Sequence, residues 1–257
     1  MILSRVIQHF RKQEWTAIAI DFVIVVIGVF VGIQVSNWNA ARIAAAQERQ
    51  YLSRLHDEVQ TSIEQLRSIN ELYAFVQSEL RSVLDVLEGP PDVEELTGTQ
   101  CTSIFFSHIY EVQYEGLPTV EELLTSGRLS SIHDNELRQL LARHQQHLEG
   151  WDRVMEGLVA DRWVIPRVHS DLIEINQNVL DFGLEPAKFM NERMDHAATC
   201  HLDLMRTDAG FRNDLIDNTT RQGLAAWFAS RQVDVLVATH KRLDEILDID
   251  HGTEESR

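Results

Sequence analysis

The chain has 257 residues, enough for one sizeable domain with appendages or for two small domains. Its formal net charge of −17 is unevenly distributed, because residues 1–40 hold three basic and two acidic residues whereas the rest holds 20 basic and 38 acidic residues. An acidic domain is repelled by nucleic acid and by anionic lipid headgroups, so the composition argues against a DNA or RNA partner.

The first fifteen residues are expected to form a short amphipathic helix in a membrane interface. Their apolar side chains recur at helical spacing and are interleaved with basic ones, as in helices that lie along a lipid surface. The apolar positions are Ile2, Leu3, Val6, Ile7 and Phe10, and the basic positions are Arg5, Arg11 and Lys12. Residues 1–15 are therefore assigned to an interfacial helix.

The next segment has the length and composition of a membrane span. Residues 16–35 form a run of twenty residues with one charged side chain, Asp21. About 20 apolar residues in a helix cross the ~30 Å hydrocarbon layer. Trp15 and Trp38 bracket the run, where indole rings favour the headgroup region. The sequence predicts a transmembrane helix over residues 16–38, with the lipid bilayer as its first partner.

A cleaved signal peptide is the alternative to this anchor. Signal peptides have an apolar core of ~7–15 residues before a small-residue cleavage site. The alanines at 40–41 and 44–46 could supply such a site. However, the apolar run is longer than that core and the helical pattern continues through the alanines, so we favour an uncleaved anchor.

The charges that flank the span favour one orientation. Basic residues precede it in a tight group and follow it in a looser group that acidic residues dilute. The first group is Arg5, Arg11 and Lys12, and the second is Arg42, Arg49 and Arg54. The positive-inside rule then predicts a short cytoplasmic N-terminus and a periplasmic C-terminal domain.

One face of the predicted span collects its polar and small residues. At about 100° per residue, this small-residue stripe comprises Asp21, Gly28, Gly32 and Ser36. Small residues four apart let two helix backbones approach closely in lipid, and an intramembrane carboxylate usually faces a partner, water or a counter-charge. The stripe is a candidate surface for homo-oligomerisation or for docking to another membrane protein. Alternatively, Asp21 reaches the interface and the glycines are incidental.

A heptad pattern follows the span and continues to Glu88. The first heptad position holds Leu52, Val59, Leu66, Tyr73, Leu80 and Leu87, and the second holds Leu55, Ser62, Ile69, Val76 and Val83. Five heptads with one polar exception predict helix-on-helix packing. Further apolar residues widen the stripe beyond a two-helix seam, so we favour an intramolecular bundle over a coiled-coil dimer.

Turn and cap residues divide the remaining domain into further helices, and no segment shows convincing strand alternation. We expect helices near 103–110, 119–127, 135–165, 186–206 and 209–249. Thr119 and Glu122 read as a capping box, and Asp134 reads as a cap. The predicted fold is all-α, with the transmembrane helix continuing into a long helix of a helical extracytoplasmic domain over 39–250 and a frayed tail at 251–257.

The two cysteines, Cys101 and Cys200, lie 99 residues apart in the sequence. Two cysteines are too few for a disulfide scaffold, and their spacing is not that of a metal site. In an oxidising compartment they could form one bridge, and otherwise they would be buried thiols.

Two sequence blocks carry a family resemblance. The stretch 21–39 has an acidic residue, an apolar run with Val-Ile-Gly28, and Asn37-Trp38-Asn39 at its exit; the stretch 118–138 has a Thr-rich start, Ser-Gly127 and a Glu-Leu-Arg138 helix. These blocks resemble a family of uncharacterised bacterial membrane-anchored proteins, although Asp21 stands where that family usually has Glu. The resemblance implies a bacterial inner-membrane, single-span protein with a helical extracytoplasmic domain, and it carries over no catalytic residue.

Candidate chemistry is sparse. His144 and His147 are three apart on one predicted helix, a spacing that can present two imidazoles to one metal ion, but solvated surface histidines are the simpler interpretation. The dipeptides His56-Asp57 and His133-Asp134 are near-chance matches to metal-dependent phosphohydrolases. The chain lacks a Walker loop, a dinucleotide-binding glycine fingerprint and a zinc-protease motif, so no metal, cofactor or catalytic residue is predicted.

Aromatic residues recur on the later predicted helices. They include Trp151, Trp163, Trp227 and Phe228. Core packing is their ordinary role, and lining of a ligand or partner groove is the alternative. The sequence thus favours a membrane-anchored helical interaction protein, scaffold or accessory subunit. A periplasmic ligand-sensing domain that works with a partner is the first alternative, and a metal-dependent hydrolase is the second.

Overall fold

The computed structural model describes residues 15–109, 114, 116–177 and 197–251, with side chains from residue 19 onward. The described chain is almost entirely helical, as predicted. It forms two compact units, Met1–Leu52 and Ser53–Arg257. The predicted interfacial helix over 1–15 falls almost wholly outside the described residues.

Helix α2 (Trp15–Glu88) begins in the first unit with an exposed apolar surface. The large hydrophobic side chains between Ile20 and Val35 are 49–68% exposed. Among the described helices, α2 is the one long and apolar enough to cross a membrane, and its most apolar window has a mean hydropathy of 2.3 with none of it buried in the protein. The predicted apolar helix over 16–38 is present, and it continues without a break into the heptad region.

The second unit buries the heptad face of α2. Its members in this unit that are at most 7% exposed are Leu55, Val59, Ser62, Leu66, Tyr73, Val76, Leu80, Val83 and Leu87. The residues that cover this face belong to the same chain, so the heptad face packs within the predicted intramolecular bundle. Burial of each large apolar side chain among them contributes about 1.5–3 kcal/mol, so this face stabilises the unit substantially.

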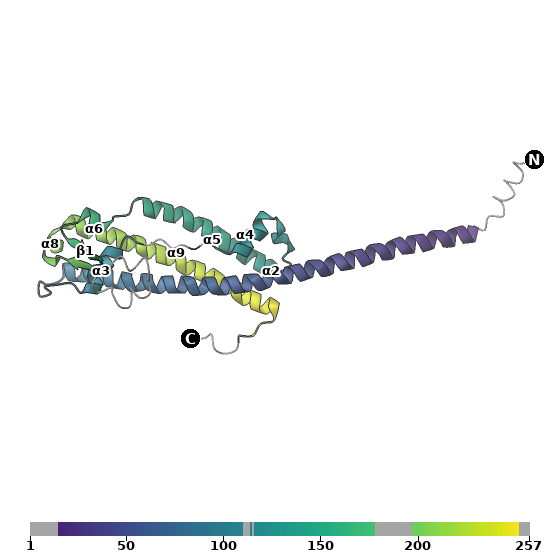
Figure 1. Ribbon diagram of the computed structural model, residues 1–257, viewed down its shortest axis with the longest axis horizontal. Coiled ribbons are helices and arrows are strands. Elements are labelled where there is room, and N and C mark those ends of the chain that lie inside the picture. The colour runs from purple at the N-terminus through teal and green to yellow at the C-terminus, as the bar shows by residue number, and fades with distance from the viewer. Residues whose placement is uncertain (1–14, 110–113, 115, 178–196, 252–257) are drawn as a thin grey trace, which may run out of the picture. The chain divides into compact units, whose positions relative to one another are not determined.

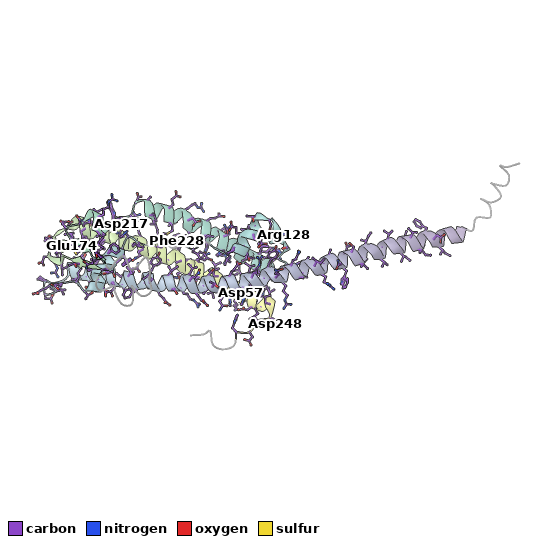
Figure 2. All side chains as sticks on the ribbon, viewed as in Figure 1. Asp57, Arg128, Glu174, Asp217, Phe228 and Asp248 are labelled. Carbon is purple, nitrogen blue, oxygen red and sulfur yellow. A yellow bond between two sulfur atoms is a disulfide. The ribbon has the colours of Figure 1, made fainter. Side chains whose placement is uncertain are left out.

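Nine further elements complete the described chain (Figure 1). They are α3 (Gly98–Phe106), α4 (Pro118–Thr125), the 3-10 turn η1 (Arg128–Ser131), α5 (Asn135–Ala160), α6 (Ile165–Val168), β1 (Ile173–Ile175), β2 (Ala198–Cys200), α8 (Leu202–Thr207) and α9 (Ala209–Leu247). Helix α5 packs along α9, and both lie beside the part of α2 that belongs to the second unit. Figure 2 shows the side chains of these elements, with Asp217 and Phe228 on α9.

One end of the second unit holds a core that the short elements close. Strands β1 and β2 pair antiparallel, with Ile173 opposite Cys200. Cys200 forms a disulfide with the buried Cys101 of α3, with a Cα–Cα distance of 5.7 Å. The bridge therefore links α3 to the two-stranded sheet across 99 residues of sequence.

Three predicted helices differ from the structure. The helix expected near 103–110 is α3, which begins at Gly98 and ends at Phe106. The helix expected over 186–206 is partly outside the described residues, and its described part contains strand β2 at 198–200 and helix α8. The helix expected over 135–165 ends at Ala160, and Pro166 instead lies in the first turn of α6, where its missing N–H costs nothing. Strands β1 and β2 exist because they pair with each other, and with three residues each they are too short for an alternation of apolar and polar residues to indicate them in the sequence.

The predicted capping box at Thr119 is wrong, because a distant carboxylate occupies its place. The N-cap of α4 is Leu117, which makes no side-chain cap. Glu58 of α2 accepts hydrogen bonds from the Thr119 N–H at 3.0 Å and from its Oγ1 at 2.6 Å. The carboxylate satisfies the Thr119 N–H at the start of α4 and joins that helix to α2.

The structure confirms the predicted helix end at Gly127 and the predicted cap at Asp134. Gly127 has φ +69° and ends the α4 turn, as expected of a glycine in the left-handed region. Asp134 accepts a hydrogen bond from the Leu137 N–H at 2.7 Å, and the Arg242 guanidinium beside it lowers the pKa of this carboxyl. A capping box does occur, at Thr97 and Gln100 before α3.

Removal of the disulfide tests how far the sheet end depends on it. We expect Cys101→Ser with Cys200→Ser to lower the free energy of unfolding by about 4–5 kcal/mol, because the bridge closes a loop of roughly 100 residues and so restricts the unfolded chain. Urea denaturation of the full-length protein in detergent measures the change. Reductant should shift the wild-type midpoint equally, and a midpoint unaffected by reductant would contradict the expectation.

Candidate functional site

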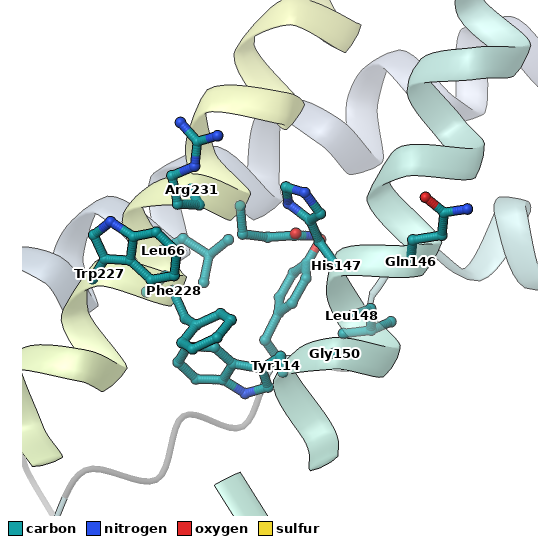
Figure 3. Close-up of a pocket in the computed structure, with 12 residues that line it drawn as sticks. Leu66, Tyr114, Gln146, His147, Leu148, Gly150, Trp227, Phe228 and Arg231 are labelled. Carbon is teal, nitrogen blue, oxygen red and sulfur yellow. The ribbon is translucent and has the colours of Figure 1, made fainter. Parts of the chain in front are cut away.

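A pocket of about 240 Å³ opens between α5 and α9 in the second unit (Figure 3). Its lining residues come from four parts of the domain: α2, the segment before α4, α5 and α9. They are Leu66, Tyr114, Gln146, His147, Leu148, Gly150, Trp151, Trp227, Phe228, Ala229, Arg231 and Gln232. A concave apolar site with a few convergent polar groups is the usual form of a small-molecule site.

Aromatic rings form one wall. Phe228 makes edge-to-face contacts with Trp227, at a ring-centroid distance of 4.9 Å, and with Trp151, at 6.0 Å. Trp151 is buried, whereas Trp227 remains 56% exposed and therefore lies at the mouth. Such pairs prefer this geometry, which fixes the orientation of the three rings before any ligand arrives.

The helical repeat explains why these residues meet. On α9, Arg231 follows Trp227 by four residues and Phe228 by three, and on α5 Trp151 follows His147 by four. Residues at these spacings share one face of a helix. Because α5 and α9 pack side by side, the two faces enclose the pocket between them.

Polar groups line the inner end. The Tyr114 hydroxyl is buried without a hydrogen-bond partner among the described residues, and burial raises the Tyr114 pKa to about 12. The phenol therefore stays protonated and able to donate at neutral pH. Gln232 donates through Nε2 to Nδ1 of His144, so the tautomer that fits this bond carries its proton on Nε2.

His144 departs from the expectation that it is a solvated histidine or half of a metal pair. It is fully buried, and burial lowers its pKa to about 4, with a smaller contribution from His147. His147 instead reaches the pocket. The two side chains have separate roles, because the first holds Gln232 inside the bundle and the second faces the mouth.

Arg231 supplies the one permanently charged side chain among the described residues that line the pocket. Burial lowers the pKa of His147, and Arg231 and Arg143 lower it further because their charges disfavour a third cation. Arg231 lines the pocket, and its ion pair with Asp234 at 3.7 Å is exposed and weak. The arrangement suits an anionic group at the mouth and an apolar group inside.

The residues predicted for interaction lie outside this domain. Asp21, Gly28, Gly32 and Ser36 are all exposed on the first unit. A Cβ built on either glycine would meet nothing within 4 Å, so the chain itself leaves their face of α2 open. The structure describes these four residues on one helix and leaves their partner undefined.

The two tryptophans predicted at the membrane interface are described to different extents. Trp38 is 66% exposed, with the Arg42 guanidinium 6.0 Å from its ring centroid. Trp15 begins α2, and its side chain lies outside the described residues.

The sequence pattern indicates the pocket only in part. Trp151, Trp227 and Phe228 are among the aromatics for which lining of a groove is the alternative interpretation, whereas no sequence signal in the predictions points to Arg231 or Leu66. Leu66 was hidden because its heptad position already explained it as core. Arg231 follows Trp227 by four residues, which places both on one face of a helix but does not show that this face borders a pocket.

Acid titration tests the buried imidazole. The unfolded His144 titrates near 6.5 and the folded one near 4, so the unfolded chain binds more protons between these values. The buried neutral imidazole makes its full contribution to the free energy of unfolding above pH 6.5. That contribution falls by about 3 kcal/mol as the pH is lowered toward 4. Replacement by His144→Gln, which keeps an acceptor for Gln232, should flatten the pH dependence of unfolding by one proton. The free energy of unfolding is measured by urea denaturation at several pH values. If its slope against pH is the same in the variant and the wild type, the assignment is wrong.

Comparison with known proteins adds no assignment to this geometry. No protein-family model, curated protein or solved structure matches the chain. The chemistry of the pocket therefore rests on its own residues.

Proposed function

We propose that this protein is a single-span membrane protein of the bacterial inner membrane whose helical periplasmic domain binds a small amphipathic anion. It acts as an accessory or sensing subunit without a catalytic step of its own. The pocket between α5 and α9, with aromatic walls and Arg231 at its mouth, is the observation that carries this proposal. It favours the ligand-sensing alternative over a scaffold that binds only proteins.

The pocket's size and lining define the ligand class. A cavity of about 240 Å³ is smaller than most drug-sized pockets, so a compact molecule fits it best. Trp151 and Phe228 offer ring faces and edges to an apolar or aromatic body, whereas Arg231 can pair with a carboxylate. A small aromatic or branched carboxylate combines both features.

The proposed location has two supports. The apolar surface of α2 needs lipid, because roughly 25 cal/mol is lost for each Å² left in water. The Cys101–Cys200 disulfide fits an oxidising compartment such as the periplasm, and cytosolic thiols would be kept reduced. The tighter group of cations before the span supports the same orientation.

A second interaction is proposed for the span itself. The small-residue stripe is exposed on a helix that the chain leaves unaccompanied. Close helix packing at Gly28 and Gly32, with Asp21 hydrogen-bonded across the contact, would assemble the protein with itself or with another membrane protein. Such a contact would let a ligand-dependent change in the domain reach a second membrane protein.

Binding to the pocket is tested with benzoate and indole-3-acetate, each compared with its uncharged amide. Full-length protein in lipid nanodiscs is titrated, and binding is followed by tryptophan fluorescence and thermal shift. We expect Arg231→Gln to weaken carboxylate binding at least ten-fold without affecting the amides, because only the charged contact is lost. Trp227→Ala, at an exposed site, should weaken both classes.

The matched control is Trp163→Phe, which changes a half-exposed tryptophan outside the pocket lining. It should bind like the wild type. If neither carboxylate shifts the wild type, or if the Arg231 variant binds both as tightly, the proposed ligand class is wrong.

Crosslinking in native membranes tests the span. Gly28→Leu with Gly32→Leu should reduce crosslinked oligomers or partner recovery several-fold, because the added side chains hold the backbones apart. Val23→Leu with Phe30→Leu changes the opposite face and should leave both signals intact. If the two double variants crosslink equally well, the small-residue stripe does not carry the contact.

A further inference from the structure

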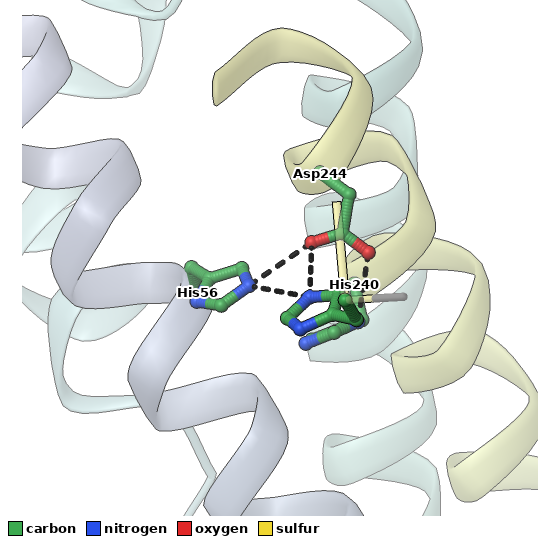
Figure 4. A group of neighbouring side chains, drawn as sticks. His56, His240 and Asp244 are labelled. Carbon is green, nitrogen blue, oxygen red and sulfur yellow. Dashed lines mark hydrogen bonds and ion pairs between the residues drawn. The ribbon is translucent and has the colours of Figure 1, made fainter. Parts of the chain in front are cut away.

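Three histidines and one aspartate converge at the end of the second unit opposite the disulfide (Figure 4). His56 comes from α2, His240 and Asp244 come from α9, and His251 follows α9. One ligand-type atom from each side chain can be chosen so that all four lie within 4.8 Å of one another. This histidine–aspartate cluster shares no residue with the aromatic pocket.

Four of the distances within the cluster are close to the spacing of ligands around a small metal ion, and the widest separation among the four ligand atoms is within 4.8 Å. Asp244 Oδ1 lies 3.0 Å from His56 Nε2 and 2.9 Å from His251 Nε2, and these two nitrogens are 3.4 Å apart. Asp244 Oδ2 lies 3.2 Å from His240 Nδ1. Ligands bound at 2.0–2.1 Å in a tetrahedron are about 3.3 Å from one another.

The side chains of the cluster are oriented in a way that suits a shared cation as well as hydrogen bonds. The Nε2 atoms of His56 and His251 both approach the same oxygen of Asp244. A metal ion at this point would take the place of the donated protons and bind both nitrogen lone pairs and the carboxylate at once.

The sequence places the four ligands by local rules. His240 and Asp244 are four residues apart and so share one face of α9. Asp248 ends that helix in the left-handed conformation, with φ 58° and ψ 45°. The Ile249 N–H then bonds back to the Asp244 carbonyl at 3.0 Å, which turns the chain so that His251 returns to the cluster.

Burial is graded across the cluster. His56 and His240 are at most 9% exposed, whereas the side chains of Asp244 and His251 are 20% and 27% exposed. The α2–α9 interface therefore encloses the inner ligands, and solvent reaches the outer ones. An ion could enter from the side of His251, the ligand that the short turn after α9 supplies.

The ligand chemistry selects the class of ion. Imidazole nitrogens suit zinc and its neighbours among the first-row transition metals, while calcium and magnesium prefer all-oxygen sites. Three imidazoles with one carboxylate make a nitrogen-rich set of low charge. The strongly acidic domain also favours cation approach.

We propose that His56, His240, Asp244 and His251 bind one divalent transition-metal ion of the zinc type, which joins the segment after α9 to α2. The ion would link α2 to α9 and to the segment after α9; the two ligands farthest apart in the sequence, His56 and His251, are separated by 195 residues. This inference stands independently of the ligand proposed for the pocket, because the two sites share no side chain.

The test uses full-length protein in detergent, stripped with chelator and then titrated with ZnCl₂. Calorimetry, metal content after gel filtration and thermal melting are measured together. We expect one equivalent of zinc to bind and to raise the melting temperature, whereas CaCl₂ and MgCl₂ do neither. Cobalt in place of zinc should give the intense visible bands of a four-coordinate site.

His251→Ala is the decisive variant, because it removes the outermost ligand, which lies beyond the last helix and contributes little to the core. It should bind zinc at least ten-fold more weakly and lose the zinc-dependent rise in melting temperature. His201→Ala removes an exposed histidine elsewhere and should behave like the wild type. Asp244→Asn tests the carboxylate with little change in shape.

Two results would overturn the proposal. One is a wild-type protein that neither retains zinc nor melts at a higher temperature with it. The other is a folded His251→Ala variant, verified by circular dichroism, that binds zinc as tightly as the wild type.

Discussion

Burial of one face of α2 against the rest of the second unit is the constraint on which the other features depend. That face removes nine side chains of the heptad pattern from water, and it determines which residues of α9 and α5 meet it. Leu66 contributes to the aromatic pocket from this face, and His56 contributes to the histidine–aspartate cluster. Both sites therefore depend on how the helices pack, since α2 contributes one side chain to each.

Polar groups inside this packing are satisfied by partners far away in the sequence. Glu58 holds the start of α4, Asn218 bonds to the Trp163 backbone and to Ser107, and Gln232 bonds to His144. A buried polar group without a partner costs about 1–3 kcal/mol, so each pairing specifies how its two segments align. These pairings favour one register of the helices, and rigid sites can form between helices that are aligned in this way.

The failed predictions share one physical cause. The motif at Thr119 and Glu122 had the spacing of a local cap, but Glu58 bound the same N–H group from another helix. Strand β2 has little pattern of its own and exists through pairing with β1 and the Cys101–Cys200 bridge. Local signals predict structure where the local interaction is the strongest one available, and they fail where a distant group competes for the same atoms.

The sequence by itself determined the all-α class, the apolar helix near the start, the heptad face of α2 and most helix ends, because helical periodicity, hydropathy and capping act within a few turns. It also contained the aromatics of the pocket and every histidine of the cluster. Only the tertiary structure decided that Arg231 stands at a pocket mouth, that His144 is buried and that His251 returns to His56 across 195 residues. Those outcomes depend on how separate helices dock and where the chain turns back, and no spacing within one helix encodes them.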